Sequence, residues 1–275
     1  MNLLITSAER NIGSYLVMYF GRKYNIMPVT QKLLNVMDRT RVYNTIANLK
    51  PDIVIHTAGM TNINHCERAE SEAYSINSIG TFNIAYACFK MDIPILFIST
   101  NYVFNGKKEL PYYETDTPDP INIYGKTMLA GEKLIRTICK RYYIIRTSYV
   151  FGTNYSFIDS VLDDKCTAVP ILYDEIVSIT HIEDLCHAID MVINSDVYGI
   201  INCADSEPVS KQNLIEKILE FSNIKKDIIK ISPESVPSHA PLPYYTALDT
   251  TFIKSCFNIE FPPWEIRLKN FIMKL

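Results

Sequence analysis

The segment from residue 6 to residue 13 stands between an apolar run and an amphipathic stretch, a place where many proteins bind a dinucleotide. Its sequence is Thr-Ser-Ala-Glu-Arg-Asn-Ile-Gly. Glycines at such a turn permit a tight bend and let the backbone approach a pyrophosphate at the helix N-terminus. Only Gly13 meets that requirement, so these residues taken alone do not predict a nucleotide site.

Histidine and cysteine, the side chains most often used to bind transition metals, show no ligand spacing. The five histidines do not pair with one another or with cysteine, and the seven cysteines form no CxxC pair. The odd count also argues against a disulfide framework. We therefore expect no metal site and reduced, buried thiols.

Composition excludes several classes of protein. The 275 residues are 48% hydrophobic and 21% charged, with a formal net charge of -3, which excludes a disordered chain and argues against a nucleic-acid binder. The N-terminus has no basic region before its first apolar residues, and no uninterrupted apolar run approaches the roughly 18 residues that a membrane span needs. We expect a cytoplasmic protein that binds neither nucleic acid nor membrane.

Short apolar segments alternate with longer amphipathic ones in the first half of the chain. The order predicts a parallel sheet with helices on both faces, whose ligands bind beyond the carboxyl ends of the strands, at residues 7–13, 57–61 and 99–106. We expect strands at residues 3–6, 25–29, 52–56, 94–99 and 142–147, and helices at residues 11–20, 69–89 and 123–139.

The pattern changes near Ser148, after which prolines and short apolar segments are frequent. One amphipathic helix is predicted at residues 211–221. We expect two parts, a sheet domain at residues 1–147 and a smaller lobe at residues 148–275. The apolar run at residues 168–172 offers a point at which the chain could rejoin the sheet.

A long central string carries a more specific signal. It runs from Ile98 to Gly106 and continues through residues 111–116, 118–132 and 145–152. The string closely resembles the dTDP-4-dehydrorhamnose reductase family, a branch of the extended short-chain dehydrogenase/reductases. The resemblance extends toward both ends of the chain, through residues 51–59, 183–185, 247–249 and 261–265. It implies a Rossmann-like, doubly wound α/β fold with a smaller C-terminal α/β substrate lobe.

The resemblance also implies a reaction, hydride transfer from NADP or NAD to the keto group of a nucleotide-linked sugar. Thr100 matches the hydroxyl that positions the carbonyl oxygen, and Tyr124 matches the phenol that gives that oxygen a proton. The cofactor positions of the family fall on Ser7, Arg10, Asn11, Ile12, Gly13, Thr57, Ala58, Gly59 and Ser99.

The family's lysine, one helical turn after the tyrosine, is replaced here by Met128. Lys126 does not restore it, because two helical residues correspond to about 200° of rotation. Without a neighbouring cation we expect the pKa of Tyr124 to stay that of an ordinary phenol. Loss of general-acid assistance typically lowers a rate by about 10²–10⁴-fold.

The glycine turn departs from the family pattern as well, at Ser7 and Arg10. An arginine there would be strained at positive φ and would stand where backbone meets pyrophosphate, although its guanidinium could also pair with phosphate. Together these departures predict a catalytically impaired relative, a pseudoenzyme that binds a nucleotide sugar, a nucleotide or a protein partner. The alternatives are an active NADH- or NADPH-dependent reductase with a remodelled cofactor site, and a pure scaffold that binds no small molecule. A protein partner or a homodimer is the macromolecular association that we expect.

Overall fold

A six-stranded parallel sheet forms the centre of the protein. The computed structural model describes the chain apart from residues 154–156, 164, 166, 172–174, 206 and 232–239. The strand order is β10-β5-β4-β3-β1-β2, and every neighbouring pair is parallel. The prediction of a doubly wound α/β sheet is confirmed. The strands are β1 (Asn2–Thr6), β2 (Asn25–Val29), β3 (Ile53–His56), β4 (Ile95–Thr100), β5 (Tyr142–Thr147) and β10 (Gly199–Asn202).

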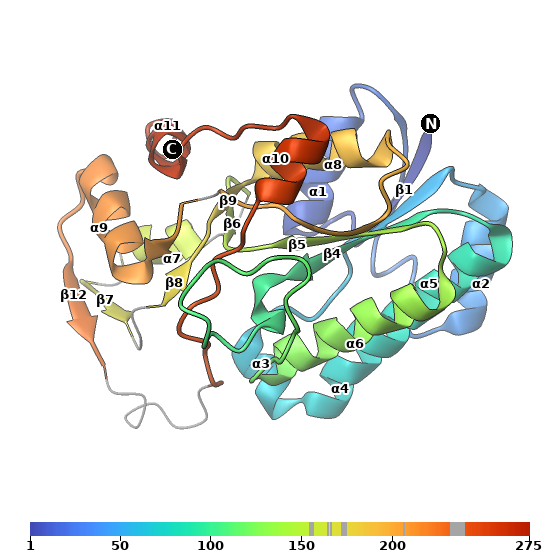
Figure 1. Cartoon of the computed structure of the whole chain (residues 1–275), viewed down its shortest axis with the longest axis horizontal. Coiled ribbons are helices and arrows are strands. Elements are labelled where there is room, and N and C mark those ends of the chain that lie inside the picture. The colour runs from blue at the N-terminus through green and yellow to red at the C-terminus, as the bar shows by residue number, and fades with distance from the viewer. Residues whose placement is uncertain (154–156, 164, 166, 172–174, 206, 232–239) are drawn as a thin grey trace.

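The strands bury both faces, because successive side chains point to opposite sides of a sheet. Leu3 and Ile5 belong to the hydrophobic cluster on one face and Leu4 to the cluster on the other. Figure 1 shows the two helical layers that cover these faces. The first layer contains α1 (Asn11–Phe20), α8 (Ile182–Ile193) and α10 (Thr251–Phe257). The second contains α2 (Arg39–Leu49), α5 (Thr81–Met91) and α6 (Ile123–Ile138).

The strand order reverses between β1 and β3. β1 pairs with β2 on one side and with β3 on the other. In open α/β sheets ligands bind beyond the carboxyl ends of the strands at such a switch point. Thr6, His56 and Thr100 end β1, β3 and β4, so the sheet brings these residues to one edge.

The long helix expected at residues 69–89 is interrupted. The structure has α4 (Glu70–Tyr74), then a π-helical turn η1 (Ser75–Gly80), then α5; α3 (Ile63–Arg68) precedes them. The amide of Asn77, inside η1, bonds both backbone groups of Met60, at 2.7 and 3.0 Å. Such π-turns occur frequently at functional sites. Apolar periodicity does not report this interruption, because the polar contact that accompanies it is tertiary.

A smaller lobe lies at one end of the sheet, on the left of Figure 1, with a hydrophobic core of its own. Its elements are α7 (Phe157–Leu162), β7 (Ala168–Ile171), β8 (Ile176–Val177), β11 (Val209–Ser210), α9 (Lys211–Ser222), β12 (Asp227–Lys230) and α11 (Trp264–Ile272). Two further short strands, β6 (Val150–Phe151) and β9 (Thr180–His181), pair with each other.

The chain rejoins the large sheet through β10, and not through residues 168–171, part of the run at residues 168–172 that the sequence offered as a point of return; residue 172 lies outside the described ones. β7 pairs instead with β12 in a two-stranded sheet. β5 ends at Thr147, while β10, α8 and α10 return to the sheet from later in the chain. The boundary at residue 147 therefore stays a prediction. No helix in the described part of the chain combines the length and apolar character of a membrane span.

Candidate functional site

Thr100 and Tyr124 meet at the carboxyl edge of the sheet. Thr100 ends β4, and its hydroxyl accepts the amide of Tyr102 at 3.2 Å, which caps the 3₁₀ turn η2 (Asn101–Val103). Tyr124 lies in the first turn of α6, whose N-cap Asn122 accepts the amide of Gly125 at 2.8 Å. The Thr100 hydroxyl acts on the Tyr124 phenol and lowers its pKa. The structure thus brings together the two residues assigned to the reacting carbonyl.

Burial governs the acidity of Tyr124. The residue is 9% exposed, and loss of hydration raises the pKa of its phenol to about 12; the Thr100 hydrogen bond lowers it and Cys66 raises it. The expectation of an ordinary phenol pKa is therefore wrong, because an isolated motif carries no information on desolvation. Among the residues that the structure describes, no positive charge acts on this phenol.

Met128 lies one helical turn from Tyr124 and is 4% exposed. Both side chains belong to the hydrophobic cluster beneath the sheet edge, together with Cys66 and Ile123. Lys126, in contrast, is exposed. The position that would hold an ammonium is thus apolar, and the nearby lysine faces solvent, as helical geometry predicts.

In the turn between β1 and α1, the strained backbone conformation is at Ser7, and not at Arg10 as expected. Ser7 has a φ of 47°, a left-handed conformation that favours glycine. Arg10 has a φ of -110° in extended backbone, where a side chain is accommodated. Gly13 packs so closely that a Cβ would lie 2.3 Å from the carbonyl oxygen of Ser7. The turn therefore keeps a backbone conformation that favours glycine, although Gly13 is the one glycine it retains.

Charged side chains flank this turn. The Arg10 guanidinium donates to the side-chain oxygen of Gln31 at 3.2 Å, and the backbone amide of Gln31 donates to the Glu9 carboxylate at 2.9 Å. Helix α1 begins at Asn11 and has no side-chain cap, so Asn11 and Ile12 lie in an uncapped first turn. Uncapped amides at a helix N-terminus favour an anion such as phosphate.

Thr57 and Ala58 lie beside this turn. The Thr6 hydroxyl accepts both of their amides, at 3.0 and 3.2 Å, and contacts the His56 ring at 3.0 Å. Burial lowers the pKa of His56 to about 3, so its imidazole is neutral. These bonds tie the end of β3 to the end of β1.

A chain of polar contacts continues from His56 to α6, the helix that carries Tyr124. His56 contacts Thr81 at 3.1 Å on its far side. Asn77 donates to the hydroxyl of Thr127 at 3.0 Å, and Thr127 donates to the backbone oxygen of Tyr124 at 2.9 Å. Gly59 lies next to Asn77, since a Cβ there would be 3.2 Å from the Asn77 oxygen. The predicted cofactor and catalytic residues are thereby linked by one buried network.

Ser99, which was also predicted to bind the cofactor, is not part of this network. Its hydroxyl donates to Glu132 at 2.6 Å, and the same carboxylate takes two hydrogen bonds from Arg146, at 3.0 and 2.7 Å. All three side chains are buried. This group fastens α6 to β4 and β5, and its geometry is that of a structural ion pair.

Four further residues form a cluster beside Tyr124 that the sequence motifs did not single out. Glu175 accepts hydrogen bonds from the phenols of Tyr102 and Tyr149, at 3.2 and 3.1 Å, and from Lys211 at 3.1 Å. The Tyr102 ring meets the Tyr124 ring edge-on, with centroids 6.0 Å apart. Glu175 precedes β8 in the smaller lobe and Lys211 is the first residue of α9, and no motif marks either residue.

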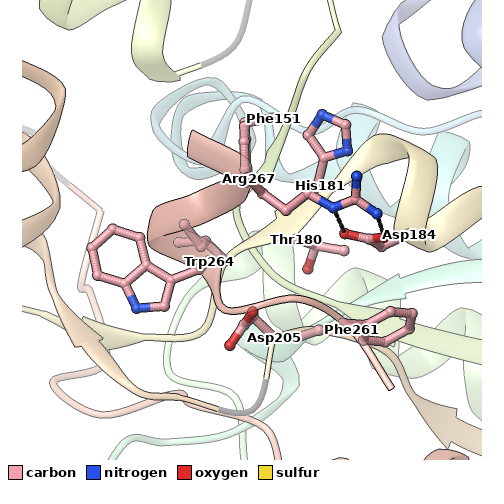
Figure 2. Close-up of a pocket in the computed structure, with 10 residues that line it drawn as sticks. Phe151, Thr180, His181, Asp184, Asp205, Phe261, Trp264 and Arg267 are labelled. Atoms are coloured by element: carbon pink, nitrogen blue, oxygen red, sulfur yellow. Dashed lines mark hydrogen bonds and ion pairs between the residues drawn. The ribbon is translucent and has the colours of Figure 1, made fainter. Parts of the chain in front are cut away.

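A small cavity lies where α8 meets α11 (Figure 2). It has a volume of about 10 Å³, roughly that of one water molecule. Arg267 bonds the Asp184 carboxylate with both nitrogens of its fork, as Figure 2 shows, and burial raises the pKa of Asp205 to about 6. This cavity is too small for a nucleotide.

In the described residues no group of three or more histidine, cysteine, aspartate or glutamate side chains could hold a metal ion.

Comparison with known proteins identifies relatives over the whole chain. A family model described as the RmlD substrate binding domain matches residues 1–275. The spore coat polysaccharide biosynthesis protein SpsK of Bacillus subtilis (strain 168) is 31% identical over 276 residues, covering 99% of this chain and 97% of that protein. A dTDP-4-dehydrorhamnose reductase of Aggregatibacter actinomycetemcomitans is 28% identical over 288 residues, covering 98% and 97%.

The fold has an experimental counterpart of similar length. A crystal structure of dTDP-4-dehydrorhamnose reductase from Bacillus anthracis in complex with NADP matches with a TM-score of 0.94. It is 28% identical, and the match covers 100% of this chain and 99% of that one. The Rossmann-like architecture is thus shared over the full length of both chains.

Proposed function

Because the chain belongs to the RmlD substrate binding domain family, we propose that it binds a nucleotide sugar and an NADP-type cofactor but is impaired as a reductase of 4-keto nucleotide sugars. One observation carries this proposal. The phenol that would donate the proton is buried at a pKa of about 12, with Met128 where a cation would stand.

The first turn fits a dinucleotide. The uncapped start of α1 offers amides to a pyrophosphate, and Gly13 keeps the close helix approach. Arg10 adds a guanidinium that could pair with phosphate, opposed by the neighbouring Glu9. Ser7, Arg10, Asn11, Ile12, Thr57 and Ala58 would line this part of the site. The nicotinamide, when bound, would supply hydride to the sugar carbon.

The chain's own residues handle the carbonyl oxygen. Thr100 would position it by hydrogen bonding, and Tyr124 would hold the proton that it needs. A phenol at pKa about 12 instead of 10 makes that transfer costlier by about 2.7 kcal/mol, roughly a hundredfold in rate if fully expressed. Slow proton donation, with retained binding, is the expected behaviour.

A second candidate is an active reductase with a remodelled site. The intact contact between Thr100 and Tyr124 favours it, since the pair remains in place to receive a carbonyl. Under either function we propose a cytoplasmic protein, because nicotinamide and nucleotide-sugar metabolism and the free buried cysteines suit a reducing compartment. A protein partner or a homodimer would be compatible with the impaired form.

The test combines binding with turnover. Calorimetric titration of the purified protein with NADP and with dTDP-rhamnose should give saturable heats, while NADPH oxidation with a dTDP-4-keto sugar should be at least 100-fold slower than in a relative that retains the lysine. Rapid turnover would establish the second candidate. Absence of binding to both ligands would overturn the proposal in favour of a scaffold.

A further inference from the structure

Glu175 is the centre of a buried polar cluster beside the proposed reaction site. Its side chain is 1% exposed. One carboxylate oxygen takes the hydrogen bonds from Tyr102 and Tyr149, and the other takes the ammonium of Lys211. A buried carboxylate is tolerated when it is paired and fully hydrogen-bonded, and this one is.

The cluster fixes the direction of its hydrogen bonds. An ionised carboxylate can only accept, and each phenol has a single hydrogen to give. The two phenol oxygens also lie 3.2 Å apart, so any hydrogen not given to Glu175 is given to the other phenol. In each arrangement the hydrogens of Tyr102 and Tyr149 stay inside the cluster. Only oxygen lone pairs remain to meet a ligand.

Protonation of both phenols persists at working pH. Burial raises the pKa of Tyr102 and of Tyr149 well above that of an ordinary tyrosine, and Glu175 raises both further. Tyr149 also has a φ of 36°, a strained conformation for an aromatic residue. Strain of this kind persists when surrounding contacts hold it and is found often at ligand sites.

The cluster adjoins the groups that would hold the carbonyl. The Tyr102 ring packs on the Tyr124 ring, and the Thr100 hydroxyl accepts the Tyr102 amide. Lys211 starts α9 in the smaller lobe, whereas Tyr102 follows β4 of the large sheet. A sugar between the lobes would thus meet a hydrogen-bond donor at Tyr124 and acceptors at Tyr102 and Tyr149, while the Thr100 hydroxyl donates to the Asn101 side chain at 3.2 Å.

We propose that Glu175 is a specificity-determining residue: by keeping Tyr102 and Tyr149 as acceptors, it selects a nucleotide sugar that carries free hydroxyl groups near the carbon beside Tyr124. This inference rests on the proposed function. Glu175 acts through the two phenols, so its role is to position and polarise them.

The experiment compares two ligands on matched variants by calorimetry. The probes are dTDP, which lacks the sugar, and dTDP-rhamnose, which carries it. In Glu175→Gln, the Lys211 ammonium donates to the amide oxygen, so the amide nitrogen lies toward the two phenols. That nitrogen donates to the phenol oxygens, which leaves the phenol hydrogens free to point toward the ligand. We expect a loss of at least 10-fold in affinity for dTDP-rhamnose and less than a twofold change for dTDP.

Two further variants complete the test. Glu220→Gln, on α9 but in an exposed ion pair with Lys217 at 3.0 Å, should leave both affinities unchanged. Tyr149→Phe removes one acceptor and should weaken dTDP-rhamnose alone, which keeps the test valid if Glu175→Gln does not fold. The inference would be overturned if Tyr149→Phe and a folded Glu175→Gln both kept the wild-type affinity for dTDP-rhamnose. It would also be overturned if these variants lost affinity equally for both ligands. In either case, binding of the ligands by the wild type would still uphold the proposed function. Failure of the wild type to bind either ligand would remove both.

Discussion

Tyr124 shows how far single residues could be interpreted from sequence. Helical spacing predicted that Met128, and not Lys126, shares its face, and the structure agrees with that. The pKa could not be predicted, because it depends on how completely the fold removes water from the phenol. The strained position in the first turn was likewise misassigned, since backbone conformation at Ser7 depends on the packing of Gly13.

Met128→Lys should lower the pKa of Tyr124. An ammonium one turn away stabilises the phenolate, so tyrosinate absorbance attributable to Tyr124 should move from about 12 toward lower pH by at least one unit. The signal is assigned by subtracting the same titration of a Tyr124→Phe protein. Lys126→Met serves as the control and should change nothing. An unmoved transition in Met128→Lys would mean that the new ammonium does not reach the phenol.

Ser7→Gly should stabilise the protein by about 1 kcal/mol, because a left-handed conformation is costly for a residue with a Cβ. Urea unfolding measures the change. Lys50→Gly is a matched control with a φ of 48° at the end of α2, and it should give a similar gain. If Lys50→Gly is stabilising and Ser7→Gly is not, the Ser7 side chain makes a contribution that outweighs its strain.

Elements were predicted well where apolar periodicity is strong. The boundaries of α1, β2 and β5 agree with the expected ranges. The interruption at η1 and the pairing of β7 with β12 were missed, because both depend on partners distant in sequence. The placement of α6 on the sheet, which positions Tyr124, depends on the buried pair of Glu132 and Arg146, and no local pattern marks it.

Glu132→Gln should lower the free energy of unfolding by about 3–5 kcal/mol, because it leaves the buried guanidinium of Arg146 uncompensated. Chemical denaturation gives the value. Arg141→Gln, at an exposed ion pair with Asp92, should cost less than about 1 kcal/mol. Equal effects of the two changes would show that the buried pair does not hold α6 in place.

At the scale of the whole molecule, the site is assembled from strand ends that the sheet topology brings to one edge. That edge could be predicted from the alternation of strands and helices. The contribution of the smaller lobe could not, because the contact of Glu175 with the Tyr102 phenol and that of Lys211 with Glu175 arise only through tertiary packing. The buried network around His56 connects the two strands at the switch point in the same way.

His56 should make global stability depend on pH. Its pKa is about 3 in the folded protein and near 6.5 when unfolded, so below pH 6.5 the unfolded state binds a proton that the folded state does not. Its contribution is complete above pH 6.5 and declines by about 1.4 kcal/mol per pH unit toward lower pH.

Denaturation of wild type and His56→Gln between pH 7.5 and 5 isolates this contribution as a difference. The difference also cancels Asp205, whose pKa of about 6 acts in the opposite direction. The stability advantage of the wild type should shrink as the pH falls. A pH-independent difference would contradict a neutral buried imidazole.

The rate of NADPH oxidation with a dTDP-4-keto sugar, measured in parallel for the wild type and Met128→Lys at saturating ligand, tests the missing cation most directly. We expect the variant to exceed the wild type by about 10²-fold or more, with its rate following the lowered pKa of Tyr124. A wild type that turns over as fast as the variant would contradict the account, because proton donation would then need no positive charge at that position.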